Sequence, residues 1–264
     1  MMFRRSSILA PFAAAALALL PVMARAQAYQ PMMPAAGPDN AKPAALENIG
    51  IDQKLNAQVP ADLVFHDETG KDVKLGDYYG KRPFILVLVY FDCPQLCTVV
   101  LNDLLRSLNA MQAMSIGHQF DVLTVSFDPH ETSALAAEKK KSYLRSYGRD
   151  GAAAGWHFLT GSQESITKLA DTVGFRYTWD PQYKQFIHAS GLMILTPNGR
   201  VSRYFYGIDY DPMDLRLALD EAAGDKIGSA VEQVLLYCFH YDPKTGKYAG
   251  RVDLAIKASG ALTV

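Results

Sequence analysis

The chain has no excess of charge of either sign. Its 264 residues include 26 Lys and Arg against 27 Asp and Glu. A chain with this balance has no strong field that would attract nucleic acid or an anionic membrane surface, so we expect no nucleic-acid partner. The sequence also shows no internal repeat, and its length suits one well-packed domain with appendages.

Cysteine is scarce, with three residues in the whole chain. An odd number of cysteines cannot pair completely within one chain. Cys93 and Cys97 are close together, whereas Cys238 lies far along the sequence. A permanent disulfide between Cys93 and Cys97 would close so short a loop that it would restrain the unfolded chain very little. We therefore interpret these two cysteines as a functional pair.

The chain lacks an uninterrupted apolar run of the roughly 20 residues that a membrane-spanning helix needs. The apolar stretch at residues 8–23 is interrupted by two prolines. Two arginines precede it, and Ala24-Arg25-Ala26 follows it as an A-x-A cleavage site, so residues 1–26 have the three parts of a secretory signal peptide. We expect an exported protein, periplasmic in a bacterium, that stays membrane-anchored if the signal is not cleaved.

The rest of the chain divides by composition into three parts. Residues 27–59 are rich in Pro, Ala and Met and have little periodicity, so we expect a flexible segment. Residues 60–224 carry the patterns of a folded domain, and residues 225–264 form a C-terminal extension.

Apolar strands and helical periodicities alternate within the domain. We expect strands at 84–90, 122–127 and 156–159, helices at about 97–111, 133–147, 163–173 and 212–222, and hairpins at 63–75 and 192–206. The stretch before His188 shows no regular pattern. This order predicts an α/β, thioredoxin-like fold with a central mixed sheet flanked by helices, an N-terminal hairpin and a C-terminal extension.

Cys93 and Cys97 fall where an apolar strand gives way to a helix. Their spacing puts both sulfurs on one face of the first helical turn. The helix N-terminus favours thiolate over thiol, so the pair suits reversible disulfide chemistry or a soft metal. Thioredoxin-type enzymes have two residues between their cysteines, whereas this pair has three. A peroxiredoxin-like peroxidase is disfavoured because Tyr90 and Pro94 stand where its threonine would precede either cysteine.

A proline is missing from the loop that faces the cysteines in thioredoxin-like redox proteins. Residues 185–190 contain His188 instead of that cis-proline. Two thiolates and one imidazole suit Cu(I) in a trigonal site, and they can hold Cu(II) with an added weak ligand. Zinc would also accept this set, but it usually takes a fourth protein ligand. We therefore predict a copper site of Cys93, Cys97 and His188, in which the cysteine pair can also form a redox disulfide.

Residues 60–222 resemble the Sco/SenC family of copper-binding proteins, which assemble cytochrome c oxidase. The resembling motifs are Tyr-Phe-Asp-Cys-Pro-Gln-Leu-Cys at 90–97, Val-Ser-Phe-Asp-Pro at 125–129, Gly-Trp-His-Phe-Leu-Thr-Gly at 155–161, and His188 before an apolar strand. Asp128 matches an acidic residue of the family motif, whereas His130 stands where other members often have Glu or Arg.

The resemblance implies a copper chaperone and not a turnover enzyme. Such a protein supplies copper to the binuclear site of cytochrome c oxidase subunit II. Other copper chaperones, thiol-disulfide reductases and membrane complexes are further partners that the resemblance allows. The alternative function is a thiol-disulfide oxidoreductase that keeps the copper-ligand cysteines of the oxidase reduced, because it would use the same two sulfurs.

Three features outside the predicted copper site have simpler explanations than a functional role. Cys238, with His240 nearby, lies among apolar residues, where a free cysteine usually packs as a small hydrophobe. Met32 and Met33 offer thioether ligands, but they belong to the segment expected to be flexible. The basic run at 139–141 fits a solvated helix face better than a docking patch.

Overall fold

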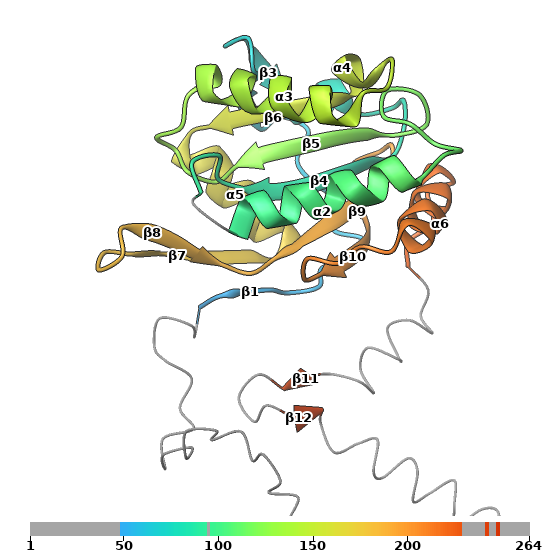
Figure 1. Cartoon of the computed structure of the whole chain (residues 1–264). Coiled ribbons are helices and arrows are strands. Elements are labelled where there is room, and N and C mark those ends of the chain that lie inside the picture. Colours follow the sequence, from blue (N-terminus) through green and yellow to red (C-terminus); the bar gives the residue numbers. More distant parts are fainter. Residues whose placement is uncertain (1–47, 94–95, 229–240, 243–246, 249–264) are drawn as a thin grey trace, which may run out of the picture. The chain divides into compact units, whose positions relative to one another are not determined.

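The computed structural model describes residues 48–93, 96–228, 241–242 and 247–248 (Figure 1). The chain divides into two units, residues 1–40 and 41–264, and all described residues belong to the second. The expected signal peptide, Met32, Met33, Cys238 and His240 lie outside the described residues. Among the helices that are described, none is long and apolar enough to cross a membrane.

A seven-stranded mixed sheet forms the centre of the domain, in the order β10-β9-β4-β5-β6-β2-β3. β4, β5 and β6 run parallel, whereas β9 is antiparallel to β4 and β2 is antiparallel to β6. Every residue of β4 and β5 is buried, as expected of parallel strands covered on both faces. The strands are β2 (Val64–His66), β3 (Asp72–Lys74), β4 (Phe84–Val89), β5 (Asp121–Ser126), β6 (Trp156–Gly161), β9 (Gly191–Leu195) and β10 (Val201–Tyr206).

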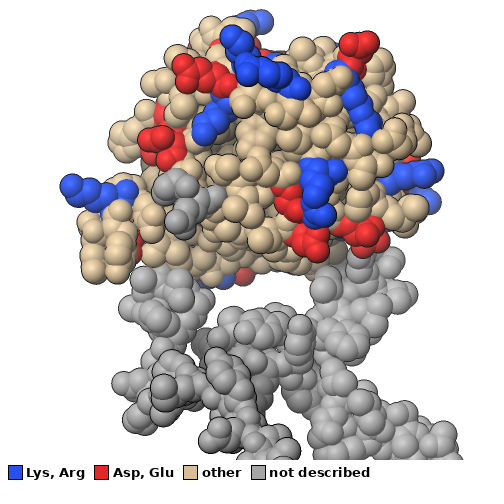
Figure 2. Space-filling view, viewed as in Figure 1, with Lys and Arg blue, Asp and Glu red and all other residues tan. Residues whose placement is uncertain are grey.

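Helices cover both faces of this sheet. α2 and α3 lie on the face turned to the viewer in Figure 1, and α5 lies behind the sheet. Basic and acidic side chains are interspersed on the viewed face (Figure 2). The helical elements are η1 (Leu75–Tyr78, a 3-10 helix), α2 (Leu96–Ala110), α3 (Ser133–Tyr147), α4 (Ala152–Gly155), α5 (Gln163–Val173) and α6 (Pro212–Ala223). The expected α/β architecture with a mixed sheet between helices is thus confirmed.

Polar caps fix where the helices begin. The side chains of Thr132, Ser162 and Asp211 each accept backbone N–H groups from the first turns of α3, α5 and α6. α5 ends at Gly174, which has a left-handed φ of 72°. A Cβ at Gly174 would also lie 2.0 Å from the carbonyl oxygen of Asp52, so this turn requires glycine.

A second sheet follows α5, where the sequence suggested an irregular stretch. β7 (Phe175–Asp180) and β8 (Gln185–His188) form a hairpin, and β1 (Gly50–Ile51) pairs with β7. The expectation of irregular chain before His188 was therefore wrong. The alternating aromatic residues of β7 are a strand signal. The turn, however, has no Asn-Gly or Asp-Gly pair, and its positive φ of 49° is taken by Lys184.

Residues 48–59 pack against the domain although they precede its expected start. β1 is hydrogen-bonded to β7, and Val59 is fully buried. In the extension, β11 (Tyr241–Asp242) and β12 (Lys247–Tyr248) form an antiparallel pair. The boundaries at residues 26, 59 and 224 stay predictions.

Candidate metal centre

Cys93, Cys97 and His188 lie together beyond the carboxyl end of β4. Their ligand atoms are all within 4.8 Å of one another, and Cys97 Sγ is 3.2 Å from His188 Nε2. All three side chains are buried, with Cys93 and His188 retaining 9 % and 8 % of their exposure. In the part of the chain that the structure describes, this is the one cluster of three potential metal-binding side chains of the types His, Cys, Asp and Glu.

Backbone amides point at both sulfurs. The N–H of Cys97 donates to Cys93 Sγ at 3.3 Å, and the N–H of Tyr90 donates to Cys97 Sγ at 3.4 Å. Such donors stabilise negative charge on sulfur. In the opposite direction, a hydrogen bond with Cys93 and burial raise the pKa of the Cys97 thiol. The metal-free pair therefore holds a proton that a bound cation would displace.

His188 is oriented by its other ring nitrogen. Nδ1 lies 2.8 Å from the carbonyl oxygen of Ala189. Because a carbonyl oxygen can only accept, Nδ1 carries the proton in this contact. Nε2 faces Cys97, and in the neutral form of the ring it carries the lone pair that a metal-binding imidazole needs.

Aromatic rings surround the imidazole. The ring centroids of Phe127, Phe175 and Tyr90 lie 5.1, 6.1 and 6.1 Å from that of His188. Burial and a hydrogen bond with Cys93 raise the pKa of the Tyr90 hydroxyl. This cluster joins the ends of β4 and β5 to the hairpin β7–β8, and so places His188 opposite the cysteines.

A cavity of about 170 Å³ opens onto the site. Cys93 and His188 line it, whereas Cys97 does not. A metal ion or an incoming ligand therefore reaches the site past Cys93, with Cys97 behind it. Among the described residues, Tyr90, Leu96 and residues 185–187 also line it.

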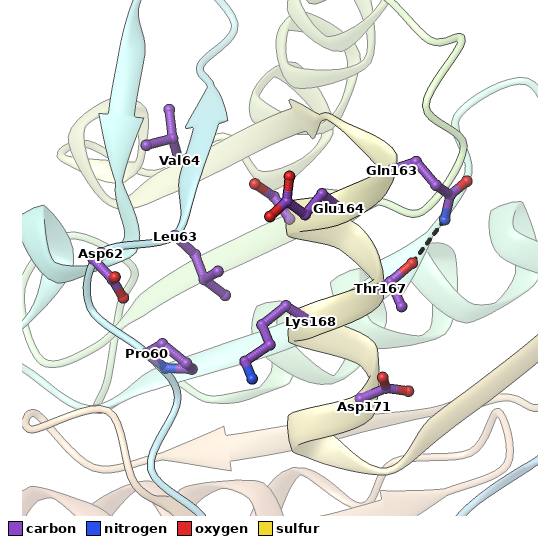
Figure 3. A pocket seen from close by; sticks show the side chains of 10 residues that line it. Pro60, Asp62, Leu63, Val64, Gln163, Glu164, Thr167, Lys168 and Asp171 are labelled. Atoms are coloured by element: carbon purple, nitrogen blue, oxygen red, sulfur yellow. Dashed lines mark hydrogen bonds between the residues drawn. The ribbon is translucent and has the colours of Figure 1, made fainter.

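Other side chains marked by the sequence lie elsewhere. Asp128 and His130 contact each other at 2.8 Å and line a second cavity of about 460 Å³. A larger cavity, about 850 Å³, lies between residues 60–64 and α5, where Lys168 reaches towards Pro60 (Figure 3). Neither Cys93 nor Cys97 nor His188 lines either of these two cavities.

The basic run at 139–141 is only partly a solvated face. Lys140 is 12 % exposed and forms an ion pair with Glu68, which is 14 % exposed. The sequence did not indicate this pair, because the two residues are distant along the chain and nothing in the run distinguishes the middle lysine from its neighbours.

Sequence reasoning also missed Glu131. Its carboxylate accepts the N–H groups of Phe91 and Asp92, the two residues that precede Cys93. Burial raises the pKa of this carboxyl, and the hydrogen bonds it accepts act in the opposite direction. Its position just after Asp128-Pro129 was the available signal, but an acidic residue before a helix is ordinarily explained by the helix itself.

Comparison with known proteins identifies the family to which the domain is similar. Residues 51–222 match the SCO1/SenC family model. The chain is 26 % identical over 172 residues to a SCO1 protein homolog of Bacillus subtilis (strain 168), covering 62 % of this chain and 81 % of that one.

Solved structures agree with this match. A protein from Aquifex aeolicus VF5 shares 29 % identity with a TM-score of 0.57, over 65 % of this chain and 95 % of that chain. Arabidopsis thaliana ScoI with copper bound has a TM-score of 0.51 at 18 % identity, over 63 % of this chain and 99 % of that chain, which is a likeness of fold. These likenesses confirm the expected fold, and the match to the family model shows that the chain belongs to the SCO1/SenC family.

Proposed function

We propose that the protein is an exported copper chaperone that holds one copper ion between Cys93, Cys97 and His188. It would deliver this ion to the binuclear copper site of cytochrome c oxidase subunit II. The observation that carries the proposal is the convergence of two sulfurs and one imidazole nitrogen within 4.8 Å. Membership of the family and the copper bound in the Arabidopsis relative support the same metal.

The donor set favours copper over other common metals. Thiolate and imidazole ligands suit Cu(I), which accepts three ligands in a trigonal arrangement. A structural zinc site would ordinarily recruit a fourth protein ligand. Among the described residues the cluster has three members, and none of them is a carboxylate of the kind that magnesium or calcium would require.

The layout of the site suits transfer by ligand exchange. Copper binding would displace the thiol protons, and the buried Cys97 would hold the ion from behind. A thiolate of the partner would enter through the cavity beside Cys93 and His188. The copper then changes ligands one at a time and never becomes a free ion. The protein in this role is a carrier, not a turnover enzyme.

The alternative function is a thiol-disulfide oxidoreductase acting on the oxidase cysteines. Two reduced cysteines in one cluster favour it, because a small movement would bring their sulfurs to bonding distance. A mixed disulfide with the partner would use the exposed edge of Cys93 first. His188 distinguishes the two functions, since disulfide exchange needs no metal ligand at that position.

The test is a Cu(I) titration of the reduced protein under a competing chelator. We expect one copper per chain, loss of tight binding in Cys93→Ser and Cys97→Ser, and weaker binding in His188→Ala. His118→Ala is the matched control, because His118 is exposed and is not part of the cluster. Unchanged stoichiometry and affinity in both cysteine variants would contradict the site.

Disulfide exchange is measured on the same variants. His188→Ala should still form the Cys93–Cys97 disulfide, because the imidazole is needed as a ligand and not as a sulfur partner. If this variant instead kept the copper affinity of the parent and lost exchange with an oxidase peptide that carries the copper-ligand cysteines, the oxidoreductase function would be preferred.

A further inference from the structure

Glu131 connects the cysteine segment to the sheet through both oxygens of one carboxylate. Its Oε2 accepts the N–H of Phe91 at 2.7 Å, and its Oε1 accepts the N–H of Asp92 at 2.6 Å. The hydroxyl of Ser126 donates to Oε2 as well. Hydrogen bonds to a carboxylate are about twice as strong as those between neutral groups.

These contacts hold residues 90–93, which belong to no helix or strand. β4 ends at Val89 and α2 begins at Leu96, so Phe91 and Asp92 lie in the connection that leads to Cys93. Their amides have no place in the β4 ladder or in the helix, and Glu131 supplies the acceptors. Ser126, the last residue of β5, pairs with Val89 across the two strands, so the network begins in the rigid sheet.

Electrostatics alone would not favour an acidic residue here. A carboxylate near two thiolates disfavours their charged form, and the charge of Glu131 contributes to raising the pKa of Cys97. The carboxylate therefore opposes thiolate formation while its hydrogen bonds order the segment that carries Cys93. Its geometry, with two acceptors on two consecutive amides, explains its presence better than its charge does.

We propose that Glu131 is a positioning residue for copper binding, which fixes the Phe91–Asp92 backbone so that Cys93 faces Cys97 and His188. The inference rests on the proposed function, because it concerns the same site. Groups that orient metal ligands without touching the metal commonly contribute about 10- to 100-fold to affinity.

Two substitutions separate geometry from charge. Glu131→Gln keeps the length of the side chain but replaces one acceptor oxygen with a donor, so one of the two amides loses its partner. Glu131→Asp keeps the charge but is shorter by one carbon–carbon bond, about 1.5 Å, and cannot reach both amides from the same backbone position. Positioning predicts that both variants bind Cu(I) about tenfold more weakly than the parent. An effect of charge alone predicts stronger binding in Glu131→Gln and no change in Glu131→Asp.

The experiment compares the reduced full chain with these variants by Cu(I) competition titration and by amide hydrogen exchange of the metal-free form. Glu138→Gln is the control, because it makes the same change of charge at an exposed position of α3. We expect both Glu131 variants to lose affinity and to exchange the Phe91 and Asp92 amides faster, with the control unchanged in both measurements.

Unchanged affinity in the Glu131 variants, stronger binding in Glu131→Gln, or weaker binding without faster exchange would each overturn the inference. If the Glu131 variants do not fold, Ser126→Ala takes their place. It removes the donor to Oε2, together with the contacts that the Ser126 hydroxyl makes with the backbone of Asp128, and leaves the Glu131 carboxylate in place. It should cause a smaller loss of affinity with faster exchange, whereas unchanged affinity overturns the inference. A parent that binds no copper would instead refute the proposed function, and the inference would fall with it.

Discussion

Replacing Phe127 with leucine should show how far the copper site depends on the aromatic cluster beneath it. Phe127 directly follows β5 and is completely buried. Its ring centroid lies within 5.5 Å of five other rings, those of Tyr90, Phe175, Tyr177, Phe186 and His188. Leucine keeps much of the apolar volume but removes every ring pair, so the substitution tests the ring contacts more than the burial.

The expected loss of stability follows from these contacts. An aromatic pair contributes about 0.5–1.5 kcal/mol beyond its buried area. The pairs share one ring and are not additive, and complete truncation of a buried Phe to Ala, at about 3–5 kcal/mol, sets a ceiling. We therefore expect Phe127→Leu to lower the free energy of unfolding by about 2–3 kcal/mol, a range between the value of one ring pair and that ceiling.

Phe65→Leu is the control for this measurement. Phe65 is equally buried, but among the described residues it has no ring partner, so its replacement should cost about 1 kcal/mol. The assay is urea unfolding of the reduced, metal-free protein, with an unchanged slope confirming that the same transition is compared. Phe127→Leu should also bind Cu(I) about tenfold more weakly, since His188 loses its support. Equal costs for the two variants, or unchanged copper affinity, would refute the role given to the cluster.

Three further predictions concern residues outside the ligand set. Burial lowers the pKa of His157 in the folded protein. The stabilisation that His157 provides is therefore complete at a pH above its pKa in the unfolded chain, about 6.5, and is lost as the pH falls below that value. The difference in unfolding free energy between the parent and His157→Asn should therefore shrink from pH 8 to pH 5, and a constant difference would contradict this. Lys140→Met leaves the nearly buried Glu68 without its cationic partner and should cost about 3 kcal/mol in denaturant unfolding, whereas Lys141→Met at an exposed position should cost almost nothing. Cys238→Ala should leave the copper stoichiometry unchanged by metal analysis and cost about 1 kcal/mol in stability, and loss of a bound copper would show that the site is incomplete.

The ligands could be predicted because they depend on local patterns and on simple topology. A fully apolar run predicts the buried strand β4, and the two cysteines directly follow it. The order of strands and helices then places the chain before β9 opposite them, which singles out His188. Each step needs only periodicity and the connection rules of α/β folds.

The hairpin that carries His188 could not be predicted in the same way. Besides the cross-strand pair of Trp179 and Phe186, with centroids 4.9 Å apart, β7 and β8 are stabilised by a ring from a distant segment, with Phe127 and Tyr177 centroids 4.6 Å apart. The outer partner of β7 is the two-residue strand β1, more than 120 residues earlier in the chain. The alternating aromatic residues of β7 indicate a strand, but the distant partner of β7 and the unusual turn leave no local signal for the pairing itself.

Glu131 shows why a metal site read from its ligands alone is incomplete. In the sequence it precedes Thr132 and α3, where an acidic residue would ordinarily be explained by the helix dipole. Its contacts with Phe91 and Asp92 exist only because β4 and β5 are parallel neighbours, which brings two chain segments about 40 residues apart to the same edge of the sheet. A metal ligand must carry a suitable donor atom, so the residue type alone identifies candidate ligands in a sequence. A residue that holds the backbone of a ligand needs only a suitable acceptor at the right place, and that place is defined by the fold.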